Sequence, residues 1–282
     1  MDNPFAQELL VEADGPVRIV TLNRPEHLNS ANARMQQSLI AVWAWLAADR
    51  DARAVVLTGA GKAFSAGGDM HHFLELHQDP QLRQREIDGT ARMVREMVAF
   101  PLPVIAAING PAVGLGCNLA VLSDVVLIGE RAYLSDPHVS VGLTAADGGA
   151  PTWPLFMSLM RAKEYLFSGA RIPAQEAVTL GLANRVVPQG DLLREAITLA
   201  HTFAAQPPQA LQSTKKALNM HLIRNMAGIL EYALSEEFRS FDQAEHQAIV
   251  HQFTDTPGTA MINDDRSAWP ASGERGCGCD YH

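Results

Sequence analysis

Two glycine-rich loops could stabilise a developing negative charge. They span residues 61–69 and 109–118, and each follows a short apolar run that is typical of a buried strand. The second loop leads directly into a helix, whose first N–H groups have no partner within that helix. Such a helix start favours anions, including the oxyanion that forms when a carbonyl group is attacked. Glycine-rich loops are also common as simple turns.

A histidine and an aspartate lie nine residues apart in the polar, glycine-containing segment 137–149. His138 has an ordinary pKa of about 6.5, which suits a base working at neutral pH. The carboxylate of Asp147 could orient the imidazole and stabilise its charged form. The alternative is a structural histidine that is hydrogen-bonded within its loop.

The elements that must position these residues alternate between strands and helices. We predict a helix from Asn29 to residue 48, a polar and mobile stretch over residues 71–87, and then a helix to residue 100. Further strands are expected at 17–22, 54–57, 104–108, 124–128 and 184–187, and further helices at 114–122, 153–168, 174–180, 192–205, 209–222 and 229–253. The pattern predicts an α/β fold with a mainly helical last third. We expect a core over residues 1–195, a helical region over 196–255 and a flexible tail over 256–282.

Composition narrows the class of protein. Hydrophobic residues make up 47% of the 282 residues and charged residues 19%, which predicts a globular chain. A net charge of −9 argues against a nucleic-acid partner, and no apolar run is long enough to predict a membrane span. Three cysteines without framework spacing favour a reducing, cytoplasmic compartment. Cys277 and Cys279 have no second ligand pair, so no metal site is predicted.

The order of the motifs resembles the crotonase (enoyl-CoA hydratase/isomerase) superfamily from about residue 15 to residue 255. The motifs that carry the resemblance are Leu22-Asn23-Arg24-Pro25, the run from Lys62 to Asp69, the run from Pro103 to Gly110, Gly114-Leu115-Gly116-Cys117, Asp124 and the run from Gly181 to Pro188. The resemblance implies a spiral of strand–strand–helix turns with a helical C-terminal trimerisation region. It also implies a homotrimer or a dimer of trimers.

The same resemblance implies an acyl-CoA thioester substrate, with coenzyme A as part of the substrate and no prosthetic group. By position, the backbone N–H groups of Gly68 and Leu115 would form the oxyanion hole. Arg24, Lys62 and Ala66 would contact the cofactor portion, the first two through its phosphates. Two further lysines, Lys215 and Lys216, could reach the adenosine end or could be solvated surface charges.

The sequence departs from the family at both catalytic glutamates. Asn118 and His138 stand at those positions, and an asparagine cannot transfer the required proton. Asn118 could instead hydrogen-bond a substrate oxygen or a water. We therefore expect His138 and Asp147 to be the catalytic pair.

The segment after His138 is similar to carbon–carbon bond hydrolases of the superfamily, of the 6-oxocamphor hydrolase type. Those enzymes carry a His and an Asp at this spacing, followed by a Trp-Pro like Trp153-Pro154, and a late glutamate that corresponds to Glu236 or Glu237. Four outcomes stay open: a hydratase or isomerase, a retro-Claisen hydrolase of a β-diketone or β-keto substrate, a thioester hydrolase, and a non-catalytic scaffold that binds an acyl-CoA.

Overall fold

The computed structural model describes residues 3–5 and 7–255, so the predicted tail with Cys277 and Cys279 lies outside the described residues. A six-stranded sheet runs in the order β1-β2-β3-β4-β6-β9, and all of its pairs are parallel except β1–β2. The strands are β1 (Leu9–Asp14), β2 (Val17–Leu22), β3 (Ala54–Gly59), β4 (Val104–Ile108), β6 (Val125–Gly129) and β9 (Arg185–Val187). Every predicted strand is confirmed within two residues. The half-exposed edge strand β1 escaped prediction.

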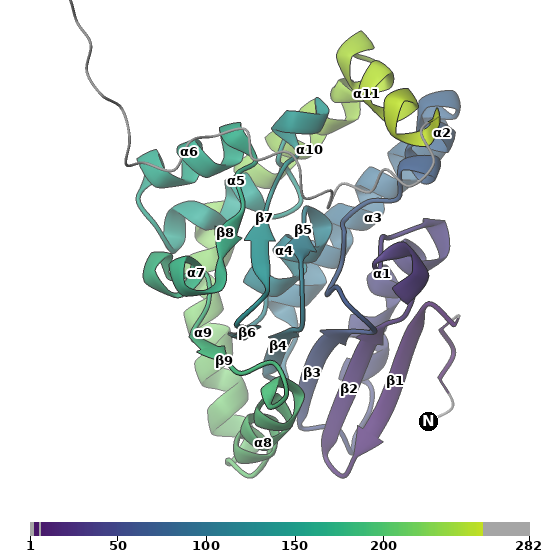
Figure 1. Cartoon of the computed structure of the whole chain (residues 1–282). Coiled ribbons are helices and arrows are strands. Elements are labelled where there is room, and N and C mark those ends of the chain that lie inside the picture. Colours follow the sequence, from purple (N-terminus) through teal and green to yellow (C-terminus); the bar gives the residue numbers. More distant parts are fainter. Residues whose placement is uncertain (1–2, 6, 256–282) are drawn as a thin grey trace, which may run out of the picture.

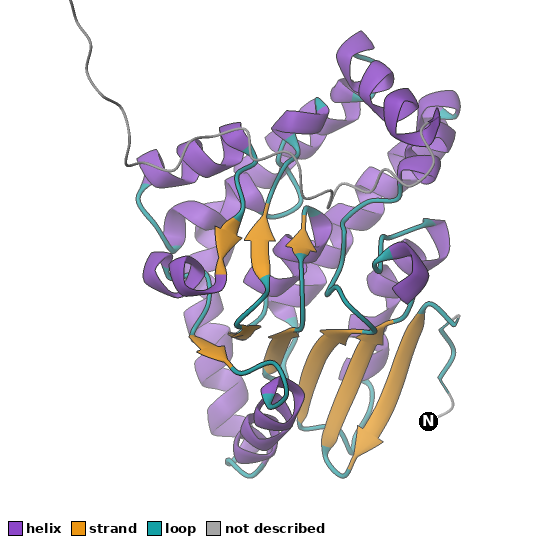
Figure 2. Cartoon of the chain, in the orientation of Figure 1, coloured by secondary structure: helices purple, strands orange, loops and turns teal. Residues whose placement is uncertain are grey.

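A second, three-stranded sheet lies beside the first and has the order β5-β7-β8. Its members are β5 (Ala112–Val113), β7 (Tyr133–Ser135) and β8 (Ile172–Pro173). After β4 the chain crosses to β5, and after β6 it crosses to β7, so successive strands alternate between the sheets (Figures 1 and 2). This alternation is the expected spiral. Segments of two or three residues are too short to show a periodicity, which is why the second sheet was not predicted.

Helices cover both sheets. They are α1 (Ala33–Ala47), α2 (Met70–Gln78), α3 (Pro80–Ala99), α4 (Leu115–Val121), α5 (Gly149–Thr152), α6 (Leu159–Ser168), α7 (Ala174–Leu180), α8 (Leu192–Ala204), α9 (Pro208–Met226), α10 (Ile229–Ser240) and α11 (Ala244–Asp255). Single turns of 3-10 helix occur at Pro25–His27, Val139–Val141 and Trp153–Leu155. No helix in the described part of the chain is long and apolar enough to cross a membrane.

Five of the predicted boundaries are wrong, and capping explains three of them. The helix predicted over 209–222 continues to Met226. The first helix begins after Asn32, whose side chain accepts the N–H of Met35, and not at Asn29. The stretch 71–87 is helical, because Asp69 and Asp79 cap the starts of α2 and α3. The helix predicted over 153–168 is interrupted before Ser158, which caps α6. The helix predicted over 229–253 is broken between α10 and α11 by a turn at residues 241–243.

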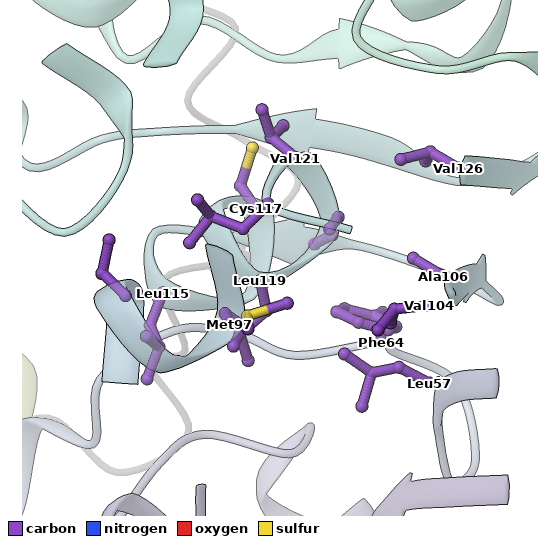
Figure 3. Close-up of a cluster of buried hydrophobic side chains, with 14 of the residues drawn as sticks. Leu57, Phe64, Met97, Val104, Ala106, Leu115, Cys117, Leu119, Val121 and Val126 are labelled. Carbon is purple, nitrogen blue, oxygen red and sulfur yellow. The ribbon is translucent and has the colours of Figure 1, made fainter. Parts of the chain in front are cut away.

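The six-stranded sheet is buried on both faces, so its strands read as continuous apolar runs. Alternate residues of β3 belong to different clusters: Val55 and Leu57 pack in the large core, and Val56 packs against α8. Figure 3 shows part of the large core, where Phe64 of the first loop lies with Leu57 and Val104. The buried Phe64 therefore anchors the first glycine-rich loop on the sheet.

Side-chain amides hold the loops in register. The fully buried Asn29 accepts the N–H of Arg24 and donates to the carbonyl oxygens of Ala60 and Ala63 at 2.9 and 2.8 Å. Asn109 accepts the N–H of Gly59 at 3.1 Å and donates to the same Ala63 oxygen at 3.2 Å. Strand ends far apart in the sequence are thereby tied to one glycine-rich loop.

Gly110 offers a test of this loop contact. A Cβ at this position would lie 2.0 Å from the carbonyl oxygen of Lys62, so G110A must push the two loops apart. Overpacking of this kind costs about 1–3 kcal/mol, which lowers the melting temperature by several degrees in a chain of this size. The matched control is G190A, because a Cβ there meets nothing within 4 Å. Thermal unfolding of both variants checks the prediction, and equal melting temperatures would contradict it.

Candidate active site

Two backbone N–H groups point into one pocket without an acceptor. The carbonyl oxygen of Gly67 accepts the N–H of Ala31 at 2.7 Å. Because a trans peptide is planar, the N–H of Gly68 points the opposite way. The carbonyl oxygen of Gly114 accepts the N–H of Asn118 at 3.0 Å, so the N–H of Leu115, the first residue of α4, points outward from the start of that helix. Within residues 3–5 and 7–255, neither N–H meets an acceptor.

His138 lies between two carboxylates. Its Nδ1 is hydrogen-bonded to Oδ1 of Asp136, and its Nε2 lies 3.5 Å from Oδ1 of Asp147. All three side chains are buried, with Asp136 fully enclosed. The ring edge is close to the second glycine-rich loop, because a Cβ on Gly114 would lie 3.7 Å from Cε1 of His138. The expected His138–Asp147 pair is thus brought together, and Asp136 joins it.

Asn118 connects the two carboxylates from behind. Its Nδ2 donates to Oδ1 of Asp147 at 2.6 Å and lies 3.4 Å from Oδ2 of Asp136. Asn118 is 1% exposed and lies outside the lining of the pocket, so the structure gives it a partner in Asp147 where a substrate contact was expected. Space for this contact comes from Gly148, where a Cβ would lie 2.6 Å from Asn118.

The carboxylates control the charge on His138. Burial alone would lower the pKa of His138, but Asp136 and Asp147 together hold it well above the usual histidine range. Burial opposes ionisation of Asp136, yet the nearby His138 holds the pKa of Asp136 below the ordinary aspartate value. An ionised Asp136 can only accept, so Nδ1 of His138 carries a proton, and Nε2 becomes available as a base once the ring loses its second proton.

A fourth ionisable group, Glu237 of α10, completes the cluster. Its side chain is buried, and its Oε2 has no hydrogen-bond partner within the described residues. Burial, together with the nearby charge of Asp147, raises the pKa of Glu237 to about 8, so the group is a neutral acid at pH 7. Its neighbour Glu236 instead pairs with Arg239 at 2.9 Å on the partly exposed side of the helix.

These groups share one pocket of about 750 Å³, open solvent at its mouth included. Gly68, Leu115, His138, Asp147 and Glu237 all line it. Two N–H donors, one imidazole and a neutral carboxylic acid therefore face a common space. Such a set can hold a carbonyl oxygen as it becomes negative, remove a proton from water and return a proton to carbon.

The expected cofactor contacts lie around the first loop. Lys62 is exposed and Ala66 is buried in that loop. The guanidinium of Arg24 already bonds the Ser30 carbonyl oxygen and lies 2.9 Å from Oδ2 of Asp69. The roles of these three residues toward coenzyme A stay predictions.

Lys215 is committed elsewhere. Its Nζ donates to Oδ2 of Asp124 at 2.6 Å and to the Leu102 carbonyl oxygen at 2.7 Å, and its side chain is 9% exposed. This geometry gives Lys215 a structural partner and takes it out of the solvent.

Sequence reasoning missed Asp136 and left Glu237 undecided. Asp136 lies two positions before His138, with Pro137 between them. The sequence of so short a loop segment does not indicate in which direction the Asp136 side chain points. The i, i+3, i+4, i+7 pattern Leu230, Ala233, Leu234, Glu237 places Glu237 on the buried face of α10, and Glu236 falls outside that pattern. That periodicity could have chosen between the two glutamates.

Comparison with known proteins gives consistent matches. The family model described as enoyl-CoA hydratase/isomerase matches residues 12–257. A short-chain-enoyl-CoA hydratase of Clostridium acetobutylicum is 32% identical over 236 residues, which cover 83% of this chain and 88% of that protein.

Solved structures agree. The crystal structure of an enoyl-CoA hydratase/isomerase from Mycobacterium paratuberculosis is 51% identical with a TM-score of 0.86, and the match covers 89% of this chain and 100% of that one. An enoyl-CoA hydratase from Mycobacterium avium subsp. paratuberculosis K-10 is 26% identical with a TM-score of 0.81, covering 89% and 97%.

The charge of Asp136 sets a testable pH dependence. A base must be deprotonated, so activity that uses His138 rises with pH through its pKa, and that limb lies above the ordinary value of about 6.5. D136N removes one of the two negative charges that raise the pKa of His138, so the rise in activity moves to lower pH. The pH profile of kcat/KM checks this, with D88N on the exposed side of α3 as control. A limb that D136N leaves in place would contradict the assignment.

Proposed function

Since this chain belongs to the enoyl-CoA hydratase/isomerase family, within the crotonase superfamily, we propose that it processes an acyl-CoA thioester with His138 and its carboxylates in place of the usual two glutamates. The observation that carries the proposal is the shared pocket. The two unpaired N–H groups of Gly68 and Leu115 and the imidazole of His138 line the same space.

In the proposed reaction the thioester carbonyl oxygen accepts hydrogen bonds from Gly68 and Leu115. His138 removes a proton from water, whose oxygen adds to the β-carbon of an enoyl thioester, and the electron pair moves onto the carbonyl oxygen as an enolate. A proton then returns to the α-carbon, and Glu237 can supply it because it is neutral at pH 7. Loss of one preorganised N–H donor in such a site raises the activation free energy by about 3 kcal/mol.

The coenzyme A portion is assigned to the first loop. We propose that Arg24 and Lys62 contact its phosphates and that the backbone of Ala66 contacts the adenine. Arg24 is ion-paired with Asp69, so it would reach a phosphate with its remaining donors. A homotrimer or dimer of trimers, in the cytoplasm, is part of the same proposal.

A second candidate is retro-Claisen cleavage, because the carbon–carbon bond hydrolases that the His138 segment resembles also carry a late glutamate, and Glu237 lines the same pocket as His138. Water activated by His138 adds to a keto carbon β to the thioester or to a second ketone. The bond between that carbon and the α-carbon breaks, its electrons form an enolate held by Gly68 and Leu115, and Glu237 protonates the α-carbon. The products are a carboxylic acid and a shortened thioester or ketone, so water is the only co-reactant.

Turnover by H138A tests the role of His138, and the products formed in heavy-oxygen water distinguish the two chemistries. Loss of a general base lowers kcat by about 100-fold to 10,000-fold, whereas H71A, on an exposed neighbour of the first loop, keeps its activity. Mass spectrometry in heavy-oxygen water with enoyl-CoA, β-ketoacyl-CoA and cyclic β-diketone substrates reads the outcome. Added water with the chain intact supports hydration. Label in a new carboxylate after chain or ring cleavage supports the retro-Claisen reaction, and undiminished turnover by H138A excludes both assignments of His138.

Glu237 has an equally matched test. E237Q keeps the shape and hydrogen bonding of the neutral acid but cannot donate its proton, so kcat falls by about 100-fold or more. In wild type, activity declines as pH rises through the Glu237 pKa of about 8, because the acid is then ionised. E236Q serves as control, since Glu236 points to Arg239. If E236Q lowers kcat as much as E237Q, Glu237 has no special role.

A further inference from the structure

A second group of polar side chains lines the same pocket, and the proposed reaction uses none of it. These residues come from α1, α2 and α3: Gln36, His72, Arg83, Glu86 and Thr90. Four are buried, and Arg83 is only 2% exposed. Lysine and arginine are almost never this buried unless they are paired. The wall of an apolar acyl pocket would need no such groups.

The spacing on α3 shows that these side chains share one helix face. Arg83, Glu86, Ile87 and Thr90 follow the i, i+3, i+4, i+7 pattern that normally carries the apolar stripe of a helix. Three of the four are polar. Thr90 accepts a hydrogen bond from Gln36 at 3.0 Å, whereas Nε of Arg83 is buried without a partner among the described residues. Burying such a donor costs free energy, which a polar occupant of the pocket would offset.

Arg83 has donors to spare. Its Nη1 donates to Oδ1 of Asp242 at 2.8 Å, and its guanidinium carbon lies 4.5 Å from the ring centre of Phe238. Its Nε is buried without an acceptor among the described residues, and Nη2 makes no hydrogen bond to any of them. The Nε and Nη2 N–H groups form the edge that binds a carboxylate with two parallel hydrogen bonds.

His72 adds a donor on α2. Its Nδ1 is 2.8 Å from Oε2 of Glu75, which leaves Nε2 free. Nε2 is buried without a hydrogen-bond partner, because Oε1 of Glu86 lies 3.8 Å away, beyond hydrogen-bond reach. Burial disfavours the charged ring, but Glu86 and Glu75 raise the pKa of His72, so that Nε2 bears a proton more readily.

We propose that Arg83 and His72 bind an acceptor oxygen on the acyl group, remote from the thioester, so that the substrate is an oxygenated acyl-CoA and not a plain alkyl one. The inference rests on the proposed function only in taking the acyl group as the occupant of this pocket. Phe73, Leu76, Ile87 and Phe241 supply apolar lining for the chain that leads to the oxygen. The acceptor is a carboxylate or a keto oxygen. A substitution at Glu86 distinguishes between them, because the negative charge of Glu86 repels an anionic carboxylate more than a neutral ketone.

Binding of unreactive saturated thioesters tests this without any turnover. At each acyl length from butanoyl to octanoyl, calorimetry compares the alkyl-CoA with its terminal carboxylate and its keto analogue. We expect an oxygenated ligand to bind at least about tenfold tighter than its alkyl counterpart, as for a hydrogen bond to a charged donor. R83M abolishes that preference, and R85M, on the exposed side of α3, retains it.

Further variants fix the nature of the oxygen. E86Q removes a negative charge beside the site, so it raises the affinity for a carboxylate ligand relative to that for a keto ligand. If R83M does not fold, H72L decides, because loss of the second donor must also reduce the preference. The proposal is overturned if alkyl ligands bind as tightly as oxygenated ones at every chain length. It is also overturned if R83M, or H72L where R83M does not fold, keeps the wild-type preference for oxygenated ligands. A preference in wild type together with H138A turnover that is undiminished would refute the proposed mechanism and leave this inference standing.

Discussion

The junction between the two glycine-rich loops is the constraint on which the site depends. The N–H of Val113 bonds the Ser65 carbonyl oxygen at 2.9 Å, and the N–H of Phe64 bonds that of Pro111 at 3.0 Å. These bonds use strand-like pairing to hold two loops that belong to different turns of the spiral. A donor that is fixed by its neighbours needs no reorganisation when charge develops, which is the physical basis of oxyanion stabilisation.

The second requirement is close approach around the carboxylates. A Cβ on Gly149 would lie 2.2 Å from Oδ2 of Asp136, so only glycine allows the start of α5 to cover that group. Enclosure removes water from Asp136, and the lost hydration is offset by His138 and by the amide of Asn118. Burial likewise keeps Glu237 neutral, so packing sets the charges of several groups in the site.

Much of the fold could be predicted from the sequence, because long apolar runs such as Val104–Ile108 and the motifs in their order specify the sheet and the family. The short strands of the second sheet have too few residues to reveal a hydrophobic periodicity.

In the site, His138 and Asp147 were predicted as a pair and do lie together. They could be found because His138 stands at a recognisable motif position with an unusual residue type. Asp136 was not, because the turn that brings its carboxylate to Nδ1 is a matter of loop geometry. The α2–α3 segment was predicted as mobile from its polarity, and its buried polar face lines the pocket instead.

The position of Asn118 bears on how such a site changes over generations. At position 118 this chain has an amide that is bonded to Asp147, a carboxylate delivered by a different segment. A glutamate at 118 would bring a further carboxylate against Asp147 and Asp136, in a space that the missing side chain of Gly148 keeps open. A change at position 118 therefore calls for matching changes at Asp147 and Gly148, so these three positions form one coupled unit.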